Sequence, residues 1–128
     1  MILDTSALVA IAFDEPEREA MVAKINVAET VAVGAPTLVE AGIVLSARIG
    51  RDAGELIAEL VVASDAVVIE FGPGHWREAV SAWWRFGKSR HAASLNFGDC
   101  LAYAAARVAG ERLLAKGDDF PQTDIQLV

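Results

Sequence analysis

Short and long apolar segments alternate along the chain, and their spacing predicts strands and helices in turn. The short segments are rich in β-branched and small apolar residues, and they predict strands at residues 1–3, 30–33, 67–71, 113–115 and 125–128. The long segments carry apolar residues at helical spacing, and they predict a helix that ends at Ala12, one that starts at Asp52, and others over about 15–27, 36–49, 76–87 and 98–108.

Glycine and proline mark the boundaries between these elements. Pro16 lies in the first turn of a predicted helix, Gly34 closes the second strand, and Gly50 ends a helix. Gly72-Pro73-Gly74 predicts a turn. Because apolar strands alternate with helices, we expect an α/β fold whose mainly parallel sheet is covered on both faces. No linker or repeat interrupts residues 1–128, so the sequence predicts a single domain.

Composition supports an ordered domain. Hydrophobic residues make up 54% of the 128 residues, which is enough to build one buried core. The only cysteine, Cys100, cannot form a disulfide within the chain. The longest uncharged stretch, Thr30 to Val39, is too short to span a bilayer, and no targeting segment is visible. We therefore expect a soluble, cytoplasmic protein with no membrane partner.

The net charge of −7 and a pI near 4.7 argue against tight, non-specific binding of nucleic acid, which requires a basic surface. An acidic balance suits a metal site built from carboxylates, or a basic protein partner. Any contact with nucleic acid must therefore be local.

One stretch departs from the acidic balance by interleaving cations with aromatic rings. Its members are Trp76, Arg77, Trp83, Trp84, Arg85, Phe86, Lys88, Arg90 and His91. Such a mixture can hold phosphates and stack bases, which makes Arg85, Lys88 and Arg90 candidate RNA contacts. The alternative is an ordinary amphipathic helix with its tryptophans in the core and its cations in solvent.

Acidic residues fall where predicted strands end and helices begin, which is where open α/β sheets place their active sites. Asp4 follows the first strand, Glu40 lies early in the helix after the second, and Asp99 stands near the start of the helix at Gly98. Asp118 and Asp119 follow the strand at residues 113–115. Buried charges of this kind need a partner, and clusters of oxygen ligands favour hard ions such as Mg²⁺ or Mn²⁺.

Each acid also has a simpler interpretation. Asp4 could cap the following helix, Asp99 could be a first-turn carboxylate favoured by the helix dipole, and Glu40 could be an exposed helix residue. Asp118 and Asp119 could form an ordinary turn. Asn96 is expected to cap the helix of Asp99. Neither Cys100 nor the isolated histidines, His75 and His91, lie in a pattern that predicts nucleophilic or histidine-based catalysis.

Four ordered segments resemble the sequence blocks of PIN domains, and of VapC toxins in particular. They are Met-Ile-Leu-Asp-Thr-Ser-Ala-Leu-Val-Ala-Ile (1–11), Pro-Thr-Leu-Val-Glu-Ala (36–41), Arg-His-Ala-Ala-Ser-Leu-Asn-Phe-Gly-Asp-Cys-Leu-Ala-Tyr-Ala-Ala-Ala (90–106) and Leu-Leu-Ala-Lys-Gly-Asp-Asp-Phe-Pro-Gln-Thr-Asp-Ile (113–125). The resemblance spans nearly the whole chain, in the family's order.

The resemblance implies a three-layer α/β/α sandwich with endoribonuclease activity that depends on Mg²⁺ or Mn²⁺. It implies cleavage of structured RNA, such as tRNA or ribosomal RNA, inhibition by a small VapB-like antitoxin from the same operon, and a homodimer. It places the metal-site acids at Asp4, Glu40, Asp99 and Asp119, with the Ser6 hydroxyl orienting a ligand or water.

For the last acid, the family pattern often places a carboxylate directly before phenylalanine, which is the position of Asp119. Gly117 can redirect the chain before it, and successive side chains of extended backbone point to opposite sides. We therefore expect Asp119 to face the site and Asp118 to face away, with Asp118 as the alternative fourth acid.

Other functions remain open at this point. A PIN-type nuclease acting on DNA would usually carry extra helical segments, for which this chain has little room. A phosphoreceiver domain would need an aspartate after the third strand, where this chain has Val-Ile-Glu-Phe-Gly-Pro. A catalytically silent PIN-like module that only binds or regulates a partner is the third alternative.

Overall fold

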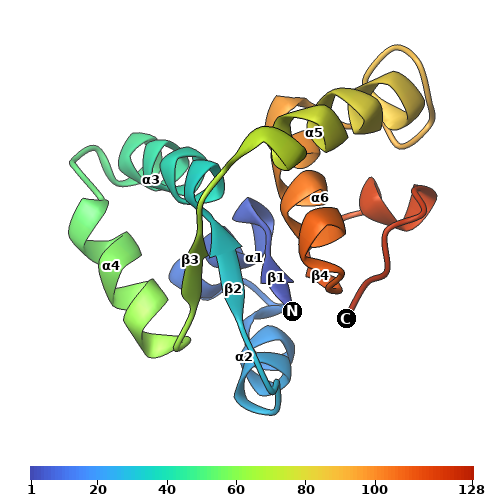
Figure 1. Ribbon diagram of the computed structural model, residues 1–128. Coiled ribbons are helices and arrows are strands. Elements are labelled where there is room, and N and C mark those ends of the chain that lie inside the picture. Colours follow the sequence, from blue (N-terminus) through green and yellow to red (C-terminus); the bar gives the residue numbers. More distant parts are fainter.

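The computed structural model describes all of residues 1–128, and strands alternate with helices along it (Figure 1). The elements are β1 (Ile2–Leu3), α1 (Thr5–Ala12), α2 (Arg18–Asn26), β2 (Ala32–Gly34), α3 (Ala35–Ile49), α4 (Gly54–Ala63), β3 (Val67–Ile69), α5 (Pro73–Phe86), α6 (Phe97–Ala109), β4 (Leu113–Leu114) and the short 3₁₀ helix η1 (Phe120–Gln122). None of the helices has the length and apolar character needed to cross a membrane.

The four strands form one parallel sheet in the order β3-β2-β1-β4. Neighbouring residues of a strand point to opposite faces, so the sheet contributes to two separate cores. Ile2 and Leu113 pack in one core with α5 and α6, whereas Leu3 and Leu114 pack in the other with α1 to α4. The predicted three-layer α/β/α architecture with a parallel sheet is confirmed.

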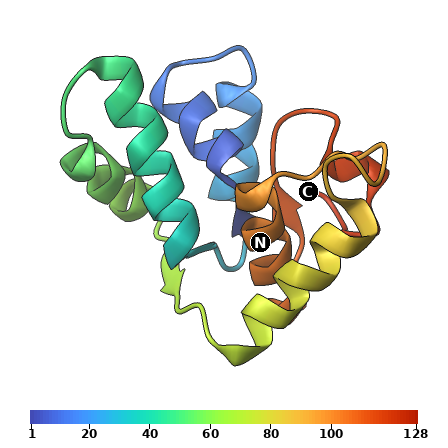
Figure 2. The same cartoon turned by 90° about the horizontal axis from the view of Figure 1, so that it is seen from above.

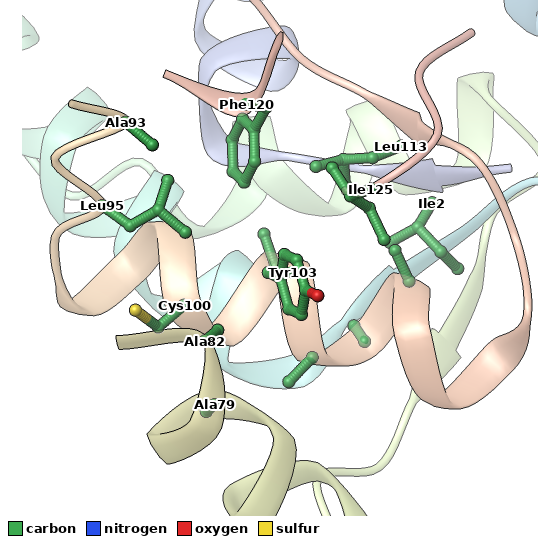
Figure 3. Packing of buried hydrophobic residues seen from close by; sticks show 14 residues of the cluster. Ile2, Ala79, Ala82, Ala93, Leu95, Cys100, Tyr103, Leu113, Phe120 and Ile125 are labelled. Atoms are coloured by element: carbon green, nitrogen blue, oxygen red, sulfur yellow. The ribbon is translucent and has the colours of Figure 1, made fainter. Parts of the chain in front are cut away.

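The core beneath α5 and α6 is built around Tyr103, whose ring lies among the labelled apolar side chains of Figure 3. On α6, Ala102, Ala105 and Ala106 are almost fully buried, and on α5 the buried residues are Ala79 and Ala82. Small side chains allow two helices to approach closely. The inner face of α5 is therefore an alanine face, which leaves its larger residues to point elsewhere.

Several predicted boundaries differ from the structure. The turn expected at Gly72-Pro73-Gly74 is instead the start of α5, because Pro73 suits the first helical position and the backbone N–H of Gly72 donates to Nδ1 of His75. The second helix begins at Arg18 rather than near Glu15.

The strand expected at residues 125–128 is also wrong, because this segment makes only an isolated bridge between Leu127 and Leu113. The preceding 3₁₀ helix and the ion pair between Arg85 and Asp124 hold the chain there as irregular structure.

Candidate active site

Asp4 is the most buried acid of the protein, with an exposed fraction of 3%. It directly follows β1 and caps α1, because its Oδ2 accepts hydrogen bonds from the Ser6 N–H (2.9 Å) and the Ser6 hydroxyl (2.5 Å). Burial raises the pKa of Asp4; the Ser6 hydrogen bonds oppose this rise, and the charge of Glu40 adds to it. The capping role and a place in an acid cluster therefore coexist in one residue.

Ser6 connects Asp4 to the loop that carries the last pair of acids. Its hydroxyl oxygen accepts a hydrogen bond from the backbone N–H of Lys116 at 2.8 Å, while the hydroxyl itself donates to Asp4. The side chain of Lys116 turns away and pairs with Glu15 and Glu17, both at 2.8 Å. The loop after β4 is thus fixed against the start of α1.

Glu40 lies in the second turn of α3 and is half-buried, so it is not the exposed helix residue of the simpler interpretation. Its Oε2 accepts a hydrogen bond at 2.7 Å from the hydroxyl of Thr5, the residue that follows Asp4 in the chain. Its carboxylate also lies against the backbone of Gly98, because a Cβ added there would overlap both carboxylate oxygens. Glu40 is therefore held between the starts of α1 and α6.

Asp99 belongs to a reciprocal cap at the start of α6. Its backbone N–H donates to Oδ1 of Asn96 (2.9 Å), and its Oδ2 accepts from the Asn96 backbone N–H (2.8 Å). The expected role of Asn96 as a cap is confirmed. Burial raises the pKa of Asp99 to about 6. The charges of three other acids contribute to this rise, and they are Asp4, Asp119 and Glu40.

The two acids after β4 differ in their surroundings, although both are exposed. Asp119 stands at the start of η1, and its negative charge contributes to the raised pKa of Asp99. The backbone carbonyl of Asp118 accepts a hydrogen bond from the Gln122 side chain. Gly117 has a φ of 102°, a left-handed conformation that favours glycine and turns the chain before this pair.

Four separate segments thus bring their carboxylates into one electrostatic environment at the starts of α1 and α6 and beside α3. None of the ion pairs in the structure includes Asp4, Glu40, Asp99 or Asp119. Like charges without a protein cation favour binding of a cation from solution.

The donor set fits a hard divalent ion, because it consists of carboxylate oxygens alone. No three acidic, histidine or cysteine side chains already converge as a closed ligand set. Hydrogen bonds to Ser6, Thr5 and Asn96 occupy one oxygen of Asp4, Glu40 and Asp99 respectively, which leaves the second oxygen of each available.

Sequence reasoning missed the supporting residues of this site. Thr5 holds Glu40, Gly98 makes room for the Glu40 carboxylate, and Lys116 fixes the last loop. Their adjacency to Asp4, Asp99 and the final acid pair was the available signal. The contacts themselves join residues that are far apart in the sequence, and so could not be read from spacing.

The cationic and aromatic stretch lies on α5 and the following loop. The guanidinium of Arg85 pairs with Asp124 at 2.5 Å and donates to the Tyr103 hydroxyl, so it is already engaged within the protein. Lys88 and Arg90 are exposed. The alternative that placed the tryptophans in the core is wrong, because Trp76, Trp83 and Trp84 are exposed by 53%, 43% and 65%.

Comparison with known proteins agrees with this fold. The PIN domain family matches residues 1–126, and the chain belongs to this family. Ribonuclease VapC36 of Mycobacterium tuberculosis is 42% identical over 127 residues, which cover 98% of this chain and 91% of the relative.

Two solved structures resemble the fold at low sequence identity. The M. tuberculosis toxin VapC20, described as a Sarcin-Ricin loop cleaving toxin, superposes with a TM-score of 0.78 at 19% identity over 99% of this chain and 97% of that one. A toxin–antitoxin complex from Klebsiella pneumoniae gives a TM-score of 0.70 at 17% identity, over 99% and 95% of the two chains.

Proposed function

We propose that this protein is a toxin endoribonuclease that hydrolyses structured RNA, such as tRNA or ribosomal RNA, at the acid cluster of Asp4, Glu40, Asp99 and Asp119. The observation that carries the proposal is the gathering of four carboxylates from four segments with no cationic partner in the protein. The ribonuclease name of the 42% identical relative supports the reaction, and so does membership of the PIN family.

The activity would depend on Mg²⁺ or Mn²⁺ held by these carboxylates, with Asp4 and Asp99 as the principal ligands. Glu40 and Asp119 would bind directly or through water. When bound, such an ion supplies an activated water and neutralises the charge that develops on the phosphate.

The surrounding residues would keep the ligands in position. Ser6 and Thr5 each donate a hydrogen bond to a carboxylate, and so orient Asp4 and Glu40. Asn96 holds Asp99 at the first turn of α6 through two hydrogen bonds. The N-termini of α1 and α6 both lie at the cluster, and their dipoles favour the negative charge of ligands and phosphate there.

The proposal is tested with purified protein, free of any partner, and a labelled structured RNA. We expect cleavage with added Mg²⁺ or Mn²⁺ and none in excess EDTA. Calorimetric titration with Mn²⁺ should show binding that Asp4→Asn weakens strongly, and Glu59→Gln, an exposed acid on α4, should leave it unchanged. Full cleavage in EDTA would contradict the metal mechanism.

A small antitoxin is the partner that we propose for this enzyme, and the Klebsiella toxin–antitoxin complex of the same fold supports it. The net charge of −7 and the unpaired acids would attract a basic segment, and an arginine there could take the place of the metal. Expression of the enzyme alone should arrest growth, and co-expression of the adjacent small reading frame should restore it. Harmless high-level expression of active enzyme would count against a toxin.

We also propose a homodimer, because a wide apolar groove remains open beside the acid cluster. The groove measures about 680 Å³ and lies between α3 and the start of α6. Its exposed apolar residues are Val39, Ile43 and Phe97. An exposed apolar patch of this kind is typical of two-fold interfaces.

Light scattering at micromolar concentration should report a dimer. Ile43→Asp should convert it to a monomer, whereas Val62→Asp, at an even more exposed apolar position on α4, should not. A monomeric wild-type protein would refute this proposal.

A further inference from the structure

Charge is distributed unequally along the chain. Residues 72–96 hold four Lys and Arg and a single acid, Glu78, which gives them a formal charge of +3 and leaves −10 for the rest. Five of the eleven Lys and Arg are bound in ion pairs, and these are Arg18, Arg48, Arg85, Arg107 and Lys116. Three of the remaining six, Arg77, Lys88 and Arg90, lie in this one segment. The segment is therefore the main concentration of available positive charge.

The same segment presents an unusual helix face. Trp76, Val80, Trp83 and Trp84 lie one and two turns apart on α5, and each is exposed by between 43% and 65%. These four residues, together with Arg90, are called the tryptophan face below. Large apolar side chains on the outside of a helix whose inner side is already packed mark a binding surface.

Arginine side chains lie over all three rings of this surface. The guanidinium of Arg90 lies 3.8 Å from the centroid of Trp84 and 5.0 Å from that of Trp83, and Arg77 lies 5.2 Å from that of Trp76. The Nε of Arg90 also donates to the Trp84 carbonyl at 3.2 Å. Arg90 is thus held over the rings of Trp83 and Trp84, and none of its nitrogens forms an ion pair with an acid.

The loop that follows the tryptophan face leads directly to the acid cluster. The backbone of Leu95 hydrogen-bonds to Phe86 and Lys88, both at 2.9 Å, which closes the loop between α5 and α6. Gly87 lies so close to Trp83 that a Cβ there would overlap its carbonyl and indole. Asn96, which caps the helix of Asp99, follows Leu95 directly, and Figure 2 shows this loop returning to the start of α6.

We propose that the tryptophan face binds unpaired nucleotides of the RNA substrate by stacking their bases on the indole and guanidinium planes. The proposal rests on RNA being the substrate of the acid cluster. Only unpaired bases offer their faces to a protein, because the bases of a duplex are already stacked. Aromatic rings mixed with cations bind single strands with little dependence on sequence. An enzyme with a net charge of −7 needs such a local cationic surface to bind a polyanion.

Charge argues against the two other occupants of this surface. A second copy related by a two-fold axis would place one cationic face against another. A basic antitoxin segment would be repelled by Arg77, Lys88 and Arg90, although the acid cluster would attract it. A strand of RNA, in contrast, is complementary to the face in both charge and stacking.

Intrinsic fluorescence reports on this surface directly, because all three tryptophans of the protein belong to it. Asp4→Asn protein in EDTA is titrated with a short oligouridine and, separately, with an RNA duplex of the same length. We expect saturable quenching by the single strand and much weaker binding of the duplex. Trp84→Ala should weaken the single-strand affinity by about 5- to 150-fold, since base stacking is worth about 1–3 kcal/mol per base. Trp84→Phe should restore most of it.

Cleavage measurements separate this proposal from the one on which it rests. With active enzyme, Trp84→Ala and Arg90→Gln should raise KM and leave kcat nearly unchanged. Lys24→Gln is the control, because Lys24 lies in the last turn of α2 and belongs to neither region, and it should change neither constant. Quenching without any cleavage would support the surface while refuting the nuclease.

Three results would overturn the tryptophan face as an RNA surface. The first is cleavage by wild-type enzyme with no quenching and with unchanged KM in both variants. The second is a dimer in light scattering that Trp84→Ala converts to a monomer. The third is quenching by a basic antitoxin peptide but not by RNA.

Discussion

The acid cluster and the tryptophan face differ in how the chain builds them. The cluster gathers Asp4, Glu40, Asp99 and Asp119 from four segments that only the fold brings together. The tryptophan face comes from one helix and the loop after it. The cluster is acidic and partly buried, with no protein cation in it, whereas the face is exposed and cationic.

Because of this difference, we assign cleavage to the acid cluster and RNA binding to the tryptophan face. An acidic pocket repels a phosphate chain until it holds a cation, and so cannot by itself provide affinity for RNA. A cationic aromatic surface has no group that could activate water, and so cannot by itself provide cleavage. We therefore expect variants of the cluster to change mainly kcat, and variants of the face to change mainly KM.

The largest effect should come from Asp4. Asp4→Asn keeps a good helix cap and both hydrogen bonds from Ser6, but it removes the buried charge. Cleavage should fall by more than about a hundredfold, since even outer residues of a metal site cost 10–100-fold when changed. Circular dichroism should show an intact fold, and binding of single-stranded RNA should be equal or tighter. Loss of RNA binding together with cleavage would break the separation of the two regions.

A second variant tests the position of Glu40 without altering any acid. In Gly98→Ala the new Cβ would overlap the Glu40 carboxylate, and this flexible side chain would move aside more readily than the backbone. Displacement of a catalytic group by about 1 Å can cost roughly a hundredfold in rate, so we expect kcat to fall by about 10–100-fold.

Gly74→Ala is the matched control, because it stands at the same position of α5 and meets only Val108 at 4.0 Å. Its kcat should equal that of the wild type. Equal activity of both variants would show that Glu40 has no part in the reaction.

A smaller effect should distinguish the last two acids. Asp119 acts on the charge of Asp99, so Asp119→Ala should reduce metal-dependent cleavage by about tenfold, as expected for an outer ligand. Asp118→Ala should stay within about twofold of the wild type. Steady-state kinetics at limiting Mn²⁺ would show the difference most clearly. The reverse order would mean that the loop after Gly117 is displaced by one residue from our assignment.

The two regions also differ in how far the sequence predicted them. The acids could be found because each stands at or near the end of an element, where parallel strands and their helices place residues on one side of the sheet. The caps at Asp4 and Asn96 followed from local chemistry. The contacts of Glu40 with Thr5 and Gly98 did not, because they depend on how α1, α3 and α6 pack.

For α5 the pattern was insufficient. Its tryptophans recur at helical spacing, which suits a buried stripe and an exposed one equally well. The alanines determine which side of α5 is buried, because Ala79 and Ala82 let α5 lie close to the alanine-rich α6 and leave the tryptophans outside. The error at residues 125–128 is of the same kind, since a short apolar run cannot say whether a neighbouring strand is available.

The smallest predicted effect is a change in stability with pH. Burial and the neighbouring acids raise the pKa of Asp99 from 3.8 to about 6, so between these values the folded state holds a proton that the unfolded state has lost. Stability of the metal-free protein attributable to Asp99 therefore decreases as the pH rises through this window and stays low above it. Repulsion among the charged acids thus lowers the free energy of unfolding of the metal-free protein.

Asp99→Asn removes this cost while an amide oxygen can still accept from Asn96. In EDTA at pH 7.5 the variant should melt roughly 2–5 °C above the wild type, a range reduced by water at this partly exposed carboxyl. The difference should shrink below pH 5, where wild-type Asp99 is protonated, and Mn²⁺ should stabilise only the wild type. Glu59→Gln should melt at the wild-type temperature at both pH values. An Asp99→Asn protein that melts at the wild-type temperature at both pH values would mean that the acids do not repel one another, and the contrast between a strained cluster and a relaxed tryptophan face would be lost.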